Sequence, residues 1–461
     1  MGIVNTPLIA RQLDAPFAVI LRPLKALSGF SGIVNVHQFL SHVNYLAGRL
    51  PDGQHVINLC ENRYLFTVAF CAVALRQQIN LLPPNKKPAT QSRLIERYQA
   101  CYVLHDDVDL ANDVEAFNVN SVSFPDEASI LEEVIPEIEL NRLVAISFTS
   151  GSTGDSKPNP KTWQVVIESS KINASHMLAD CRDSLLYQLA TVPPQHMWGL
   201  ETTVLLPLFE SVCVADSKPL FPKDIYETLD VLPEPRIMVT TPVHLRALCA
   251  SQMAFPTLQL ILCATSPLSQ DLAEQTERLF SAELREVYGC SEIGSMAIRN
   301  TVENSPWTLF TGIHMDISGD GCVAASTDYL PESIVLQDRI RMLDKRCFEL
   351  RGRVADMVDI AGKRGSLLEI NRVLMAFPGI VDGIVFMPES KQAVTRLAAL
   401  VVLPNEVQCD ELKKYLRQHL DNAFIPRPIF KVKQLPREEN GKLPIKQLQA
   451  YYRQLVDAEL T

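Results

Sequence analysis

Short apolar runs, each followed by a polar loop, recur between about residues 56 and 290 and alternate with segments of helical pattern. This alternation limits the fold more than any other feature, because it is typical of α/β proteins, in which strands and helices take turns along the chain. Ligands of such proteins usually bind in the loops that end the strands. The expected strands are 56–59, 79–82, 100–104, 143–146, 184–192, 237–240, 258–263 and 284–287, with a buried helix at 65–76.

The pattern changes after about residue 310, where short antiparallel strands are expected at 315–318, 321–326 and 333–336. Beyond Arg353 the expected elements are a strand at 357–360, a helix at 368–375, strands at 383–386 and 397–403, a helix at 409–419 and a final basic segment. The predicted fold class is α/β, with a large N-terminal domain of layered sheets and helices, residues 1–353, and a small, mobile α+β domain, residues 354–461. A hinge is expected near residues 353–356.

Composition and charge narrow the class of protein. The apolar content of 47% and the charged content of 21% are those of an ordinary soluble chain. A net charge of −10 argues against nucleic acid as a partner, because phosphate backbones bind basic surfaces. The 11 cysteines include no Cys-x-x-Cys pair, which favours reduced thiols in a cytoplasm over a disulfide framework or a zinc site. No run of eighteen apolar residues occurs, so no membrane span is expected.

A hydroxyl-rich segment follows the apolar run Leu143–Ile146. Between Thr149 and Lys157 it contains five hydroxyl side chains, two glycines and a terminal lysine. Glycines let the backbone come close to a ligand, hydroxyl and N–H groups donate hydrogen bonds, and the lysine adds positive charge, so the segment is suited to holding phosphate. An ordinary Ser/Gly loop is the alternative. The phosphate loop of NTPases is excluded, because Ser156 stands where that motif needs glycine and Pro158 where it needs a hydroxyl residue.

Two further segments place carboxylates after predicted strands. Ser291 and Glu292 follow the run 284–287, and a hydroxyl beside a carboxylate can ligate magnesium and a phosphate oxygen together. The nucleophile elbow of hydrolases does not fit, because Gly289 and Gly294 are one residue too far apart. Asp338 follows the run 334–336 and could hold both hydroxyls of a ribose. An exposed polar loop and a solvated aspartate are the respective alternatives.

The C-terminal part contains two more motifs. Residues 352–356 read Gly-Arg-Val-Ala-Asp and are followed by Gly362-Lys363-Arg364 and then Glu369-Ile370. Residues 436–442 place Lys442 directly after an Asn-Gly turn, where a plain surface lysine is the alternative.

Together, in this order, the five segments resemble the ANL superfamily of adenylate-forming enzymes. That superfamily includes acyl- and aryl-CoA synthetases, adenylation domains of peptide synthetases, and luciferases. The resemblance extends from about Gly53 to Gln447. Residues 193–199 look like the segment whose histidine lines the acyl pocket, and residues 263–268 look like the loop that stacks on adenine.

The resemblance implies ATP and Mg²⁺ as cofactors and assigns roles to particular residues. The expected contacts to the β- and γ-phosphates of ATP are Thr149, Ser150, Gly151, Ser152, Thr153, Gly154 and Lys157. The other expected roles are Ser291 at the α-phosphate, Glu292 on Mg²⁺, Tyr288 on adenine beside Thr265 and Ser266, Asp338 on the ribose with help from Arg353, His196 at the carboxylate substrate near Trp198, and Lys442 at the carboxylate and the α-phosphate.

The implied reaction has two steps. A carboxylic acid and ATP give an acyl-adenylate and pyrophosphate, and a thiol then displaces AMP to give a thioester. The thiol would belong to CoA or to the phosphopantetheine of an acyl carrier protein. In the superfamily the small domain rotates between the steps, which removes Lys442 and brings in the loop at residues 362–364.

The chain departs from the superfamily pattern at several positions. Ser156 and residues 158–160, Pro-Asn-Pro, alter the exit of the phosphate loop and leave the role of Lys157 open. Ala355 stands where a hinge aspartate or lysine is common. The chain is short, and its sequence 161–163, Lys-Thr-Trp, looks like that of the stand-alone ligases in aryl-polyene and xanthomonadin-type pigment clusters. That subgroup implies a hydroxybenzoate- or cinnamate-like acid.

Three other functions stay open from the sequence. They are an adenylate-forming enzyme with a non-thiol acceptor, a fatty-acid-specific synthetase, and a non-catalytic scaffold. The presence of Glu292, Asp338, Arg353 and Lys442 counts against the scaffold. Two basic clusters could steer an acidic carrier protein, although a solvated face is the alternative. They comprise Arg339, Arg341, Lys345, Arg346, Arg351 and Arg353, and Lys413, Lys414, Arg417, Arg427, Lys431 and Lys433.

Overall fold

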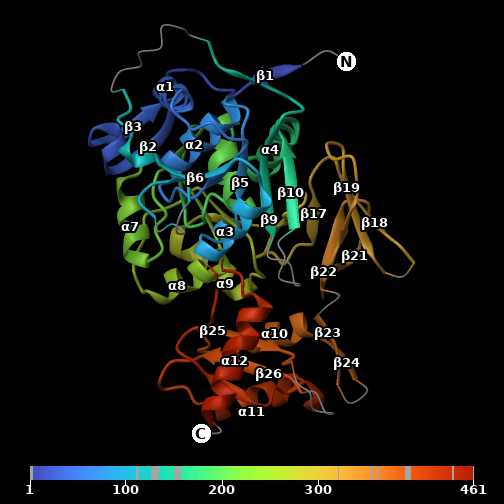
Figure 1. Cartoon of the computed structure of the whole chain (residues 1–461). Coiled ribbons are helices and arrows are strands. Elements are labelled where there is room, and N and C mark those ends of the chain that lie inside the picture. Colours follow the sequence, from blue (N-terminus) through green and yellow to red (C-terminus); the bar gives the residue numbers. More distant parts are fainter. Residues whose placement is uncertain are drawn as a thin grey trace. The chain divides into compact units, whose positions relative to one another are not determined.

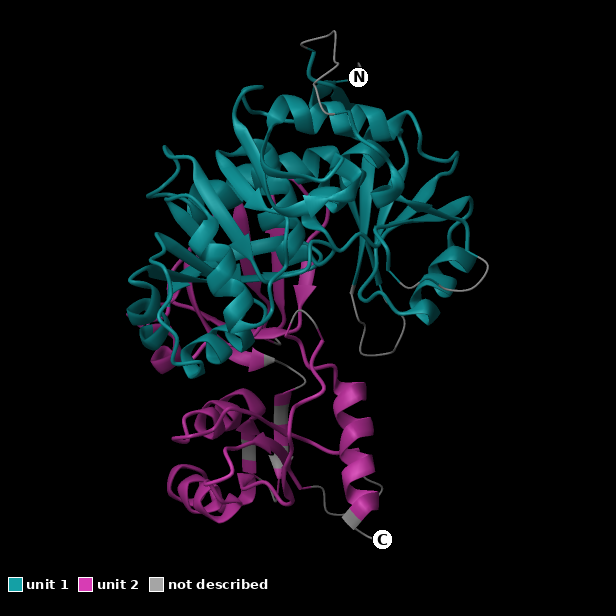
Figure 2. Cartoon of the chain, turned by 90° about the vertical axis from the view of Figure 1, so that its left-hand side faces the viewer, with its two compact units in different colours: residues 1–265, 274–300 teal, residues 266–273, 301–461 magenta. Residues whose placement is uncertain are grey.

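The computed structural model of the chain is an α/β protein with two compact units (Figure 2). The first unit comprises residues 1–265 and 274–300, and the second comprises residues 266–273 and 301–461. The residues described are 4–108, 110, 114–125, 134–149, 157–319, 321–353, 356–360, 363–389, 396–438 and 441–459. The predicted fold class, a large sheet-rich N-terminal part and a smaller C-terminal part, is confirmed. The predicted boundary after Arg353 adjoins undescribed residues and stays a prediction.

One sheet of the first unit has the order β10-β9-β5-β4-β6-β7 (Figure 1). Its strands β4 to β7 and β9 run parallel. Between β4 and β5 lies α2, a helix so apolar that every residue from Arg63 to Ala74 is buried. It begins where the side chain of Asn62 accepts a hydrogen bond from the N–H of Leu65. The strands are β4 (His55–Asn58), β5 (Ile79–Leu82), β6 (Cys101–His105), β7 (Ala116–Asn118), β9 (Leu143–Thr149) and β10 (Lys157–Thr162), and the helices are α1 (Val36–Ala47), α2 (Arg63–Leu75) and α3 (Pro88–Arg97).

A second layer of the first unit contains the strand order β16-β15-β14-β13-β11-β12-β2-β3. The strands from β2 to β15 run parallel, β3 pairs antiparallel with β2, and β16 pairs antiparallel with β15. The strands are β2 (Pro16–Leu24), β3 (Phe30–Asn35), β11 (Leu186–Ala190), β12 (Val212–Ala215), β13 (Arg236–Thr240), β14 (Leu260–Cys263), β15 (Glu283–Cys290) and β16 (Gly294–Asn300). The helices are α4 (Trp163–Met177), α5 (Met197–Leu200), the π-helix η3 (Glu201–Leu205), α6 (Leu206–Phe209), α7 (Pro222–Val231), α8 (Pro242–Ala250) and α9 (Gln270–Phe280). A two-stranded ladder joins β1 (Asn5–Pro7) to β8 (Glu137–Glu139).

Strand β10 is where the structure differs from the expected loop exit. Residues 158–160 were expected to reshape a loop, yet Lys157–Thr162 form an antiparallel edge strand on β9. Proline has no N–H for a ladder, and an edge strand tolerates it where that position faces away from the neighbouring strand. Pro158 and Pro160 are two residues apart, so in one and the same register both have their nitrogen on the side of the strand that faces away from β9. The two prolines therefore specify a strand and its register.

The second unit is built from short strands, most of which pair antiparallel. The expected strands after residue 310 are confirmed as β18 (Ile313–Ile317), β19 (Val323–Thr327) and β20 (Ile334–Leu336). Beside them in sequence are β17 (Trp307–Leu309), β21 (Asp338–Met342) and β22 (Cys347–Arg353). The tail contains β23 (Met357–Ile360), β24 (Lys363–Ser366), α10 (Leu367–Met375), β25 (Asp382–Phe386), β26 (Ala398–Val402), α11 (Cys409–His419), β27 (Ile429–Lys431) and α12 (Ile445–Glu459). No helix among the described residues is long and apolar enough to cross a membrane.

Strand β26 shows why the tail folds as a layered α+β element. Its residues alternate between two hydrophobic clusters. Ala399 and Val401 pack with α10 and α11, whereas Ala398 and Leu400 pack with residues of α12 such as Leu448. A central strand with helices on both faces is apolar at every position, which is why the sequence shows it as a continuous apolar run.

Candidate active site

The carboxyl ends of the parallel strands β11, β13, β14 and β15 lie along one edge of the second sheet. The register pairs Ala190 with Val239, Thr240 with Cys263, and Cys263 with Glu286. The residues that follow these strands therefore gather at that edge, where open α/β sheets bind their ligands. Thr265 and Ser266 follow β14, and Tyr288 lies on β15, which pairs with β14. The role predicted for these residues at adenine stays a prediction.

Thr265 has a strained backbone. Its φ is +87°, a left-handed value that residues with a Cβ rarely adopt. Strain of this kind persists only where the surrounding structure imposes it, and it concentrates at ligand sites. Both Thr265 and its neighbour Ser266 are half-buried.

Ser291 and Glu292 lie in the turn of a β-hairpin. The ladder between β15 and β16 ends with Cys290 opposite Gly294, which leaves residues 291–293 as the turn. Ser291 and Glu292 are both half-buried. An oxygen from a hydroxyl and two from a carboxylate, on neighbouring residues of a tight turn, are donors that suit Mg²⁺ and a phosphate group.

Two buried charged side chains form hydrogen bonds with this hairpin. Lys161, 2% exposed, donates from Nζ to the carbonyl oxygen of Glu292 at 2.5 Å. Glu201, also 2% exposed, accepts from the N–H of Ser295 at 3.1 Å and from its hydroxyl at 2.7 Å. The side chain of Asn173 donates to the same carboxylate at 3.1 Å. The hairpin backbone is thus held at Glu292 in the turn and at Ser295 in β16.

Burial disfavours the charged forms of Lys161 and Glu201, whereas neighbouring groups favour them. Burial lowers the pKa of Lys161, while the carboxylate of Glu201 acts in the opposite direction. Burial raises the pKa of Glu201, while the hydrogen bonds from Ser295 and Asn173 and the charge of Lys161 act against that rise. Each charge therefore depends on the other and on its hydrogen-bond partners.

A second polar group lies where β11 and β13 end. The hydroxyls of Thr191 and Thr240 are 2.9 Å apart, and the Nδ1 atom of His244 is 3.2 Å from Thr191 Oγ1. Trp198 donates from its indole to the carbonyl of Thr240 at 3.3 Å. Burial lowers the pKa of His244 to about 4, and Lys218 adds to this effect, so the ring is neutral at pH 7.

The predicted acid-contacting residue, His196, precedes α5. It is half-buried, and its carbonyl accepts the N–H of Leu200. The sequence interpretation placed the acid pocket around residues 196–202, 240–244 and 263–266. It missed Thr191, because a threonine at the end of a strand carries no local signal of function.

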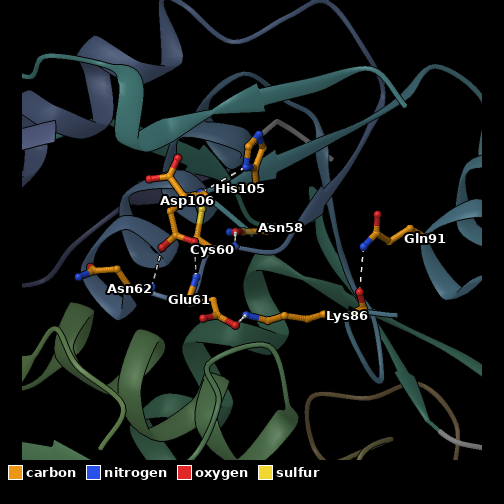
Figure 3. A network of polar contacts seen from close by, with 9 residues as sticks. Asn58, Cys60, Glu61, Asn62, Lys86, Gln91, His105 and Asp106 are labelled. Carbon is orange, nitrogen blue, oxygen red and sulfur yellow. Dashed lines mark hydrogen bonds and ion pairs between the residues drawn. The ribbon is translucent and has the colours of Figure 1, made fainter. Parts of the chain in front are cut away.

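The first sheet carries its own polar network, which the sequence interpretation did not predict (Figure 3). At the carboxyl ends of β4 and β6, the carboxylate of Asp106 accepts the N–H groups of Glu61 and Asn62 at 2.7 and 2.6 Å. Lys86 donates to Glu61 at 3.1 Å. Burial raises the pKa of Asp106 to about 6. The carboxylate is occupied in holding the start of α2, which indicates a structural role.

In the second unit, two predicted ribose-binding residues lie opposite each other. Asp338 begins β21 and pairs with Arg353, the last residue of β22. The structure therefore sets the backbones of these two residues opposite each other, and their shared role stays a prediction.

Lys442 projects from a tight turn at the end of the predicted motif. The N–H of Glu438 donates to the carbonyl of Lys442, the N–H of Gly441 donates back to Glu438, and Lys442 is exposed. Arg437 donates to the carbonyl of Gly441 at 3.0 Å and forms a two-pronged ion pair with Asp382, at 2.7 and 2.8 Å. The sequence interpretation missed Asp382, which lies on β25.

Several predicted residues fall outside the described part. They are Ser150, Gly151, Ser152, Thr153, Gly154 and Ser156 of the phosphate loop, and Ala355 and Gly362 near the hinge. The backbones of Thr149 and Arg353 are described as strand residues. Lys157 is exposed at the start of β10, paired with Thr149. The roles predicted for all of these residues stay predictions.

Comparison with known proteins agrees with this fold and shows the family of the chain. The chain matches the family of AMP-binding enzymes over residues 33–314 and their C-terminal domain over residues 369–442, so it belongs to this family. It is 27% identical over 238 residues to a 4-coumarate–CoA ligase of Rhodobacter capsulatus, covering 51% of this chain and 58% of that protein. It is 20% identical over 323 residues to a 3,4-dihydroxybenzoate–[aryl-carrier protein] ligase of Bacillus anthracis, covering 66% and 73%.

Solved structures share the fold over almost the whole chain. ATP-bound MatB from Rhodopseudomonas palustris has a TM-score of 0.77 and 17% identity, covering 96% of this chain and 97% of that one. The o-succinylbenzoate coenzyme A synthetase of Bacillus subtilis, in complex with AMP, has a TM-score of 0.78 and 17% identity, covering 97% and 98%. The family match confirms the resemblance to the ANL superfamily, and the relatives named above, which are acid–thiol ligases by name, support the assignment to that class. The likeness to the pigment-cluster ligases stays a prediction.

Proposed function

We propose that this protein activates an aryl carboxylic acid as its acyl-adenylate and transfers the acyl group to a thiol. The observation that carries the proposal is the β15–β16 turn. This turn, which contains Ser291 and Glu292, follows β15 at the carboxyl ends of the parallel strands, where open α/β sheets commonly bind ligands, and two buried charged side chains contact it and the start of β16.

Mg²⁺ fits the donor set of this turn. No group of three or more His, Cys, Asp or Glu side chains in the described part of the chain could hold a metal ion. Mg²⁺ commonly keeps several waters and binds one or two carboxylates together with substrate phosphates. Glu292 with the phosphates of ATP would provide such a site, in which the ion would screen charge on the triphosphate.

In the first step, a carboxylate oxygen of the acid attacks the α-phosphorus of ATP, and pyrophosphate leaves with the electrons of the broken P–O bond. Two anions must meet, so positive charge and hydrogen-bond donors lower the barrier. Ser291 would donate to the α-phosphate, and Lys442 would neutralise charge that develops on its oxygens. Asp338 and Arg353 would hold the ribose, and the loop at residues 149–157 would hold the departing phosphates. Tyr288, Thr265 and Ser266 would hold the adenine.

In the second step, a thiolate attacks the acyl carbon and AMP leaves. The acceptor would be CoA or the phosphopantetheine of a carrier protein supplied in trans. The two basic clusters identified in the sequence differ in how much positive charge they offer to such a partner. Arg341 and Arg351 near the predicted hinge both pair with Glu349. The cluster on and after α11 includes the exposed Lys414, Arg417, Arg427 and Lys433, and it is the better surface for an acidic carrier protein.

An aryl acid bearing a hydroxyl group suits the polar cluster at the ends of β11 and β13. The Thr191, Thr240 and His244 side chains offer donors and acceptors, and neutral His244 adds no charge. A site that hydrogen-bonds a substrate hydroxyl rejects analogues lacking it, because its buried polar groups are then unpaired. The two relatives named above take 4-coumarate and 3,4-dihydroxybenzoate, by their names, which supports a hydroxyaryl substrate.

ATP–pyrophosphate exchange tests the proposal directly. Benzoate, hydroxybenzoates, cinnamates and fatty acids would each be assayed with the wild-type protein and with Lys442→Ala. We expect exchange with one or more hydroxyaryl acids and its loss in the variant. Exchange with fatty acids alone would overturn the aryl assignment, and exchange with no acid would overturn the adenylation step. Adding CoA or a carrier protein to the active acid then identifies the acceptor.

A further inference from the structure

We propose that Lys161 and Glu201 are positioning residues for adenylation, which hold the Ser291–Glu292 turn in the geometry that binds the magnesium-bound phosphates. This inference rests on the proposed function and extends it to two buried side chains that contact the hairpin backbone. Lys161 acts at Glu292 in the turn, and Glu201 acts at Ser295 in β16.

Lys161 reaches the turn because of the register of β10. Along this strand Asn159 and Lys161 are buried, whereas Pro158 and Pro160 are exposed. A slip of one residue would move every side chain to the opposite face and would turn the prolines toward the β9 ladder. The prolines thus specify the register in which the lysine points inward and donates to the carbonyl of Glu292, 131 residues away in sequence.

Glu201 holds the other end of the turn, and it fits closely. A Cβ added to Gly294 would lie 2.2 Å from the Glu201 Oε1 atom, so only glycine leaves room for the carboxylate. Gly294 also has a φ of +103°, which favours glycine. Glu201 begins the π-helix η3, and π-helical turns occur frequently at functional sites. The carboxylate therefore contacts the hairpin at the point where the turn enters β16.

Stability alone does not account for this pair. Two buried charges carry a desolvation cost, and apolar side chains of similar volume are commonly as stabilising or more so. The pair instead restricts the position of the turn, because a charge-assisted hydrogen bond to one carbonyl is directional and apolar packing is not. Supporting groups of this kind typically change metal affinity or activity by about 10–100-fold when removed.

The test uses a double variant, Lys161→Met with Glu201→Gln, because removing both charges leaves no unpaired buried ion. The amide of glutamine can still accept the N–H of Ser295. We expect a melting temperature within about 5 °C of the wild type. We also expect the Mg²⁺ concentration for half-maximal ATP–pyrophosphate exchange to rise about tenfold, with a fall of about tenfold or more in the exchange rate at saturating Mg²⁺.

Two control variants separate positioning from general damage. Lys171→Met makes the same replacement at an exposed lysine of α4, where it removes only an ion pair with Glu168. Val68→Ala removes buried volume from α2 and supplies a destabilised protein whose turn is intact. Both should keep the Mg²⁺ requirement of the wild type. The inference is overturned by an unchanged Mg²⁺ requirement in the double variant, or by an equal change in Val68→Ala.

A binding measurement keeps this test independent of the proposed reaction. By calorimetry without any acid, the double variant should bind Mg·ATP about tenfold more weakly than the wild type but bind metal-free ATP equally well. Equal binding of Mg·ATP by both proteins would overturn the inference even if exchange is observed. If the wild type exchanges with no acid, the proposed function fails, and the difference in Mg·ATP binding still decides the inference.

Discussion

Two turns of this protein, one in each compact unit, are each held by a charged side chain that donates to a backbone carbonyl. The two side chains differ in how deeply they are buried. In the β15–β16 turn, Lys161 donates to the carbonyl of Glu292. In the turn that carries Lys442, Arg437 donates to the carbonyl of Gly441 and pairs with Asp382. Lys161 is 2% exposed, whereas the side chains of Arg437 and Asp382 are 17% and 15% exposed.

This difference in burial has energetic consequences. A fully buried charge cannot be left alone, so the lysine and its carboxylate neighbour must be present or absent together. A partly exposed pair keeps access to water, so losing one partner costs less and salt screens what remains. The first turn is therefore expected to be rigid and intolerant of single changes, and the second to be adjustable, as suits a lysine needed in only one of two steps.

The largest expected effect is on stability at the buried turn. Lys161→Met alone leaves Glu201 buried without its cationic neighbour and should cost about 3–5 kcal/mol of unfolding free energy. Lys161→Met combined with Glu201→Gln should recover most of that loss. Urea unfolding of the two variants and the wild type measures the difference. Equal losses in the single and double variants would show that the two charges are independent.

The next effect concerns chemistry at the exposed turn. Lys442→Ala should remove about 3–4 kcal/mol of transition-state stabilisation from adenylation and slow it by a hundredfold or more. Its stability should stay near that of the wild type, because Lys442 is exposed. Thioester formation from presupplied acyl-adenylate should be spared. Equal losses in both steps would contradict the role assigned to Lys442.

His244 is a buried titratable side chain that contrasts with Lys161, because the charged neighbour that acts on it among the described residues is the cation Lys218 and not a carboxylate. Its pKa is about 4 in the folded protein, below the ordinary value of 6.5, so between these values the unfolded chain binds more protons. Stability should therefore fall as the pH is lowered from 6.5 to 4, by about 3 kcal/mol from this group. Urea unfolding at pH 7, 5 and 4 should show a shallower loss in His244→Gln. Parallel curves would rule this contribution out.

The smallest expected effect is at the partly exposed ion pair. Arg437→Met should cost about 1–2 kcal/mol of stability and slow adenylation by about tenfold, less than Lys442→Ala does. Raising the salt concentration should narrow the stability gap between variant and wild type, since screening already weakens the pair. A loss as large as that of Lys161→Met would remove the proposed difference between the two turns.

The sequence predicted the regular elements well where the signal was local. The strand at 79–82 and the helix at 409–419 have the bounds expected from their apolar patterns. Other elements were missed where a local rule conflicted with context. Residues 157–162 contain two prolines and were expected to form part of a loop, because edge position, which makes the prolines acceptable, is a property of the sheet. The helix α12 was expected only as a basic segment.

The candidate site divides in the same way. Ser291, Glu292, Asp338 and Lys442 could be proposed from the sequence because each stands in a short segment with its own residue chemistry, and their roles stay predictions. Glu201 lay within the expected pocket range 196–202 but was given no supporting role, and Asp382 was not noticed, since each contacts a segment 94 or 55 residues away. Lys161 was noticed only as nearby charge, and its inward direction depends on the strand register.

The sequence by itself determined the class of protein, because the order of five short motifs identifies the superfamily and the residue types in them identify the chemistry. The tertiary structure decided how those motifs are held. A lysine can be a solvated surface charge, or it can be buried and hold a turn. Which of the two it is depends on whether residues distant in sequence form the hydrogen bonds that water would otherwise form with it. That replacement of water takes place only when β10, η3 and the β15–β16 hairpin come together, so no local pattern records it.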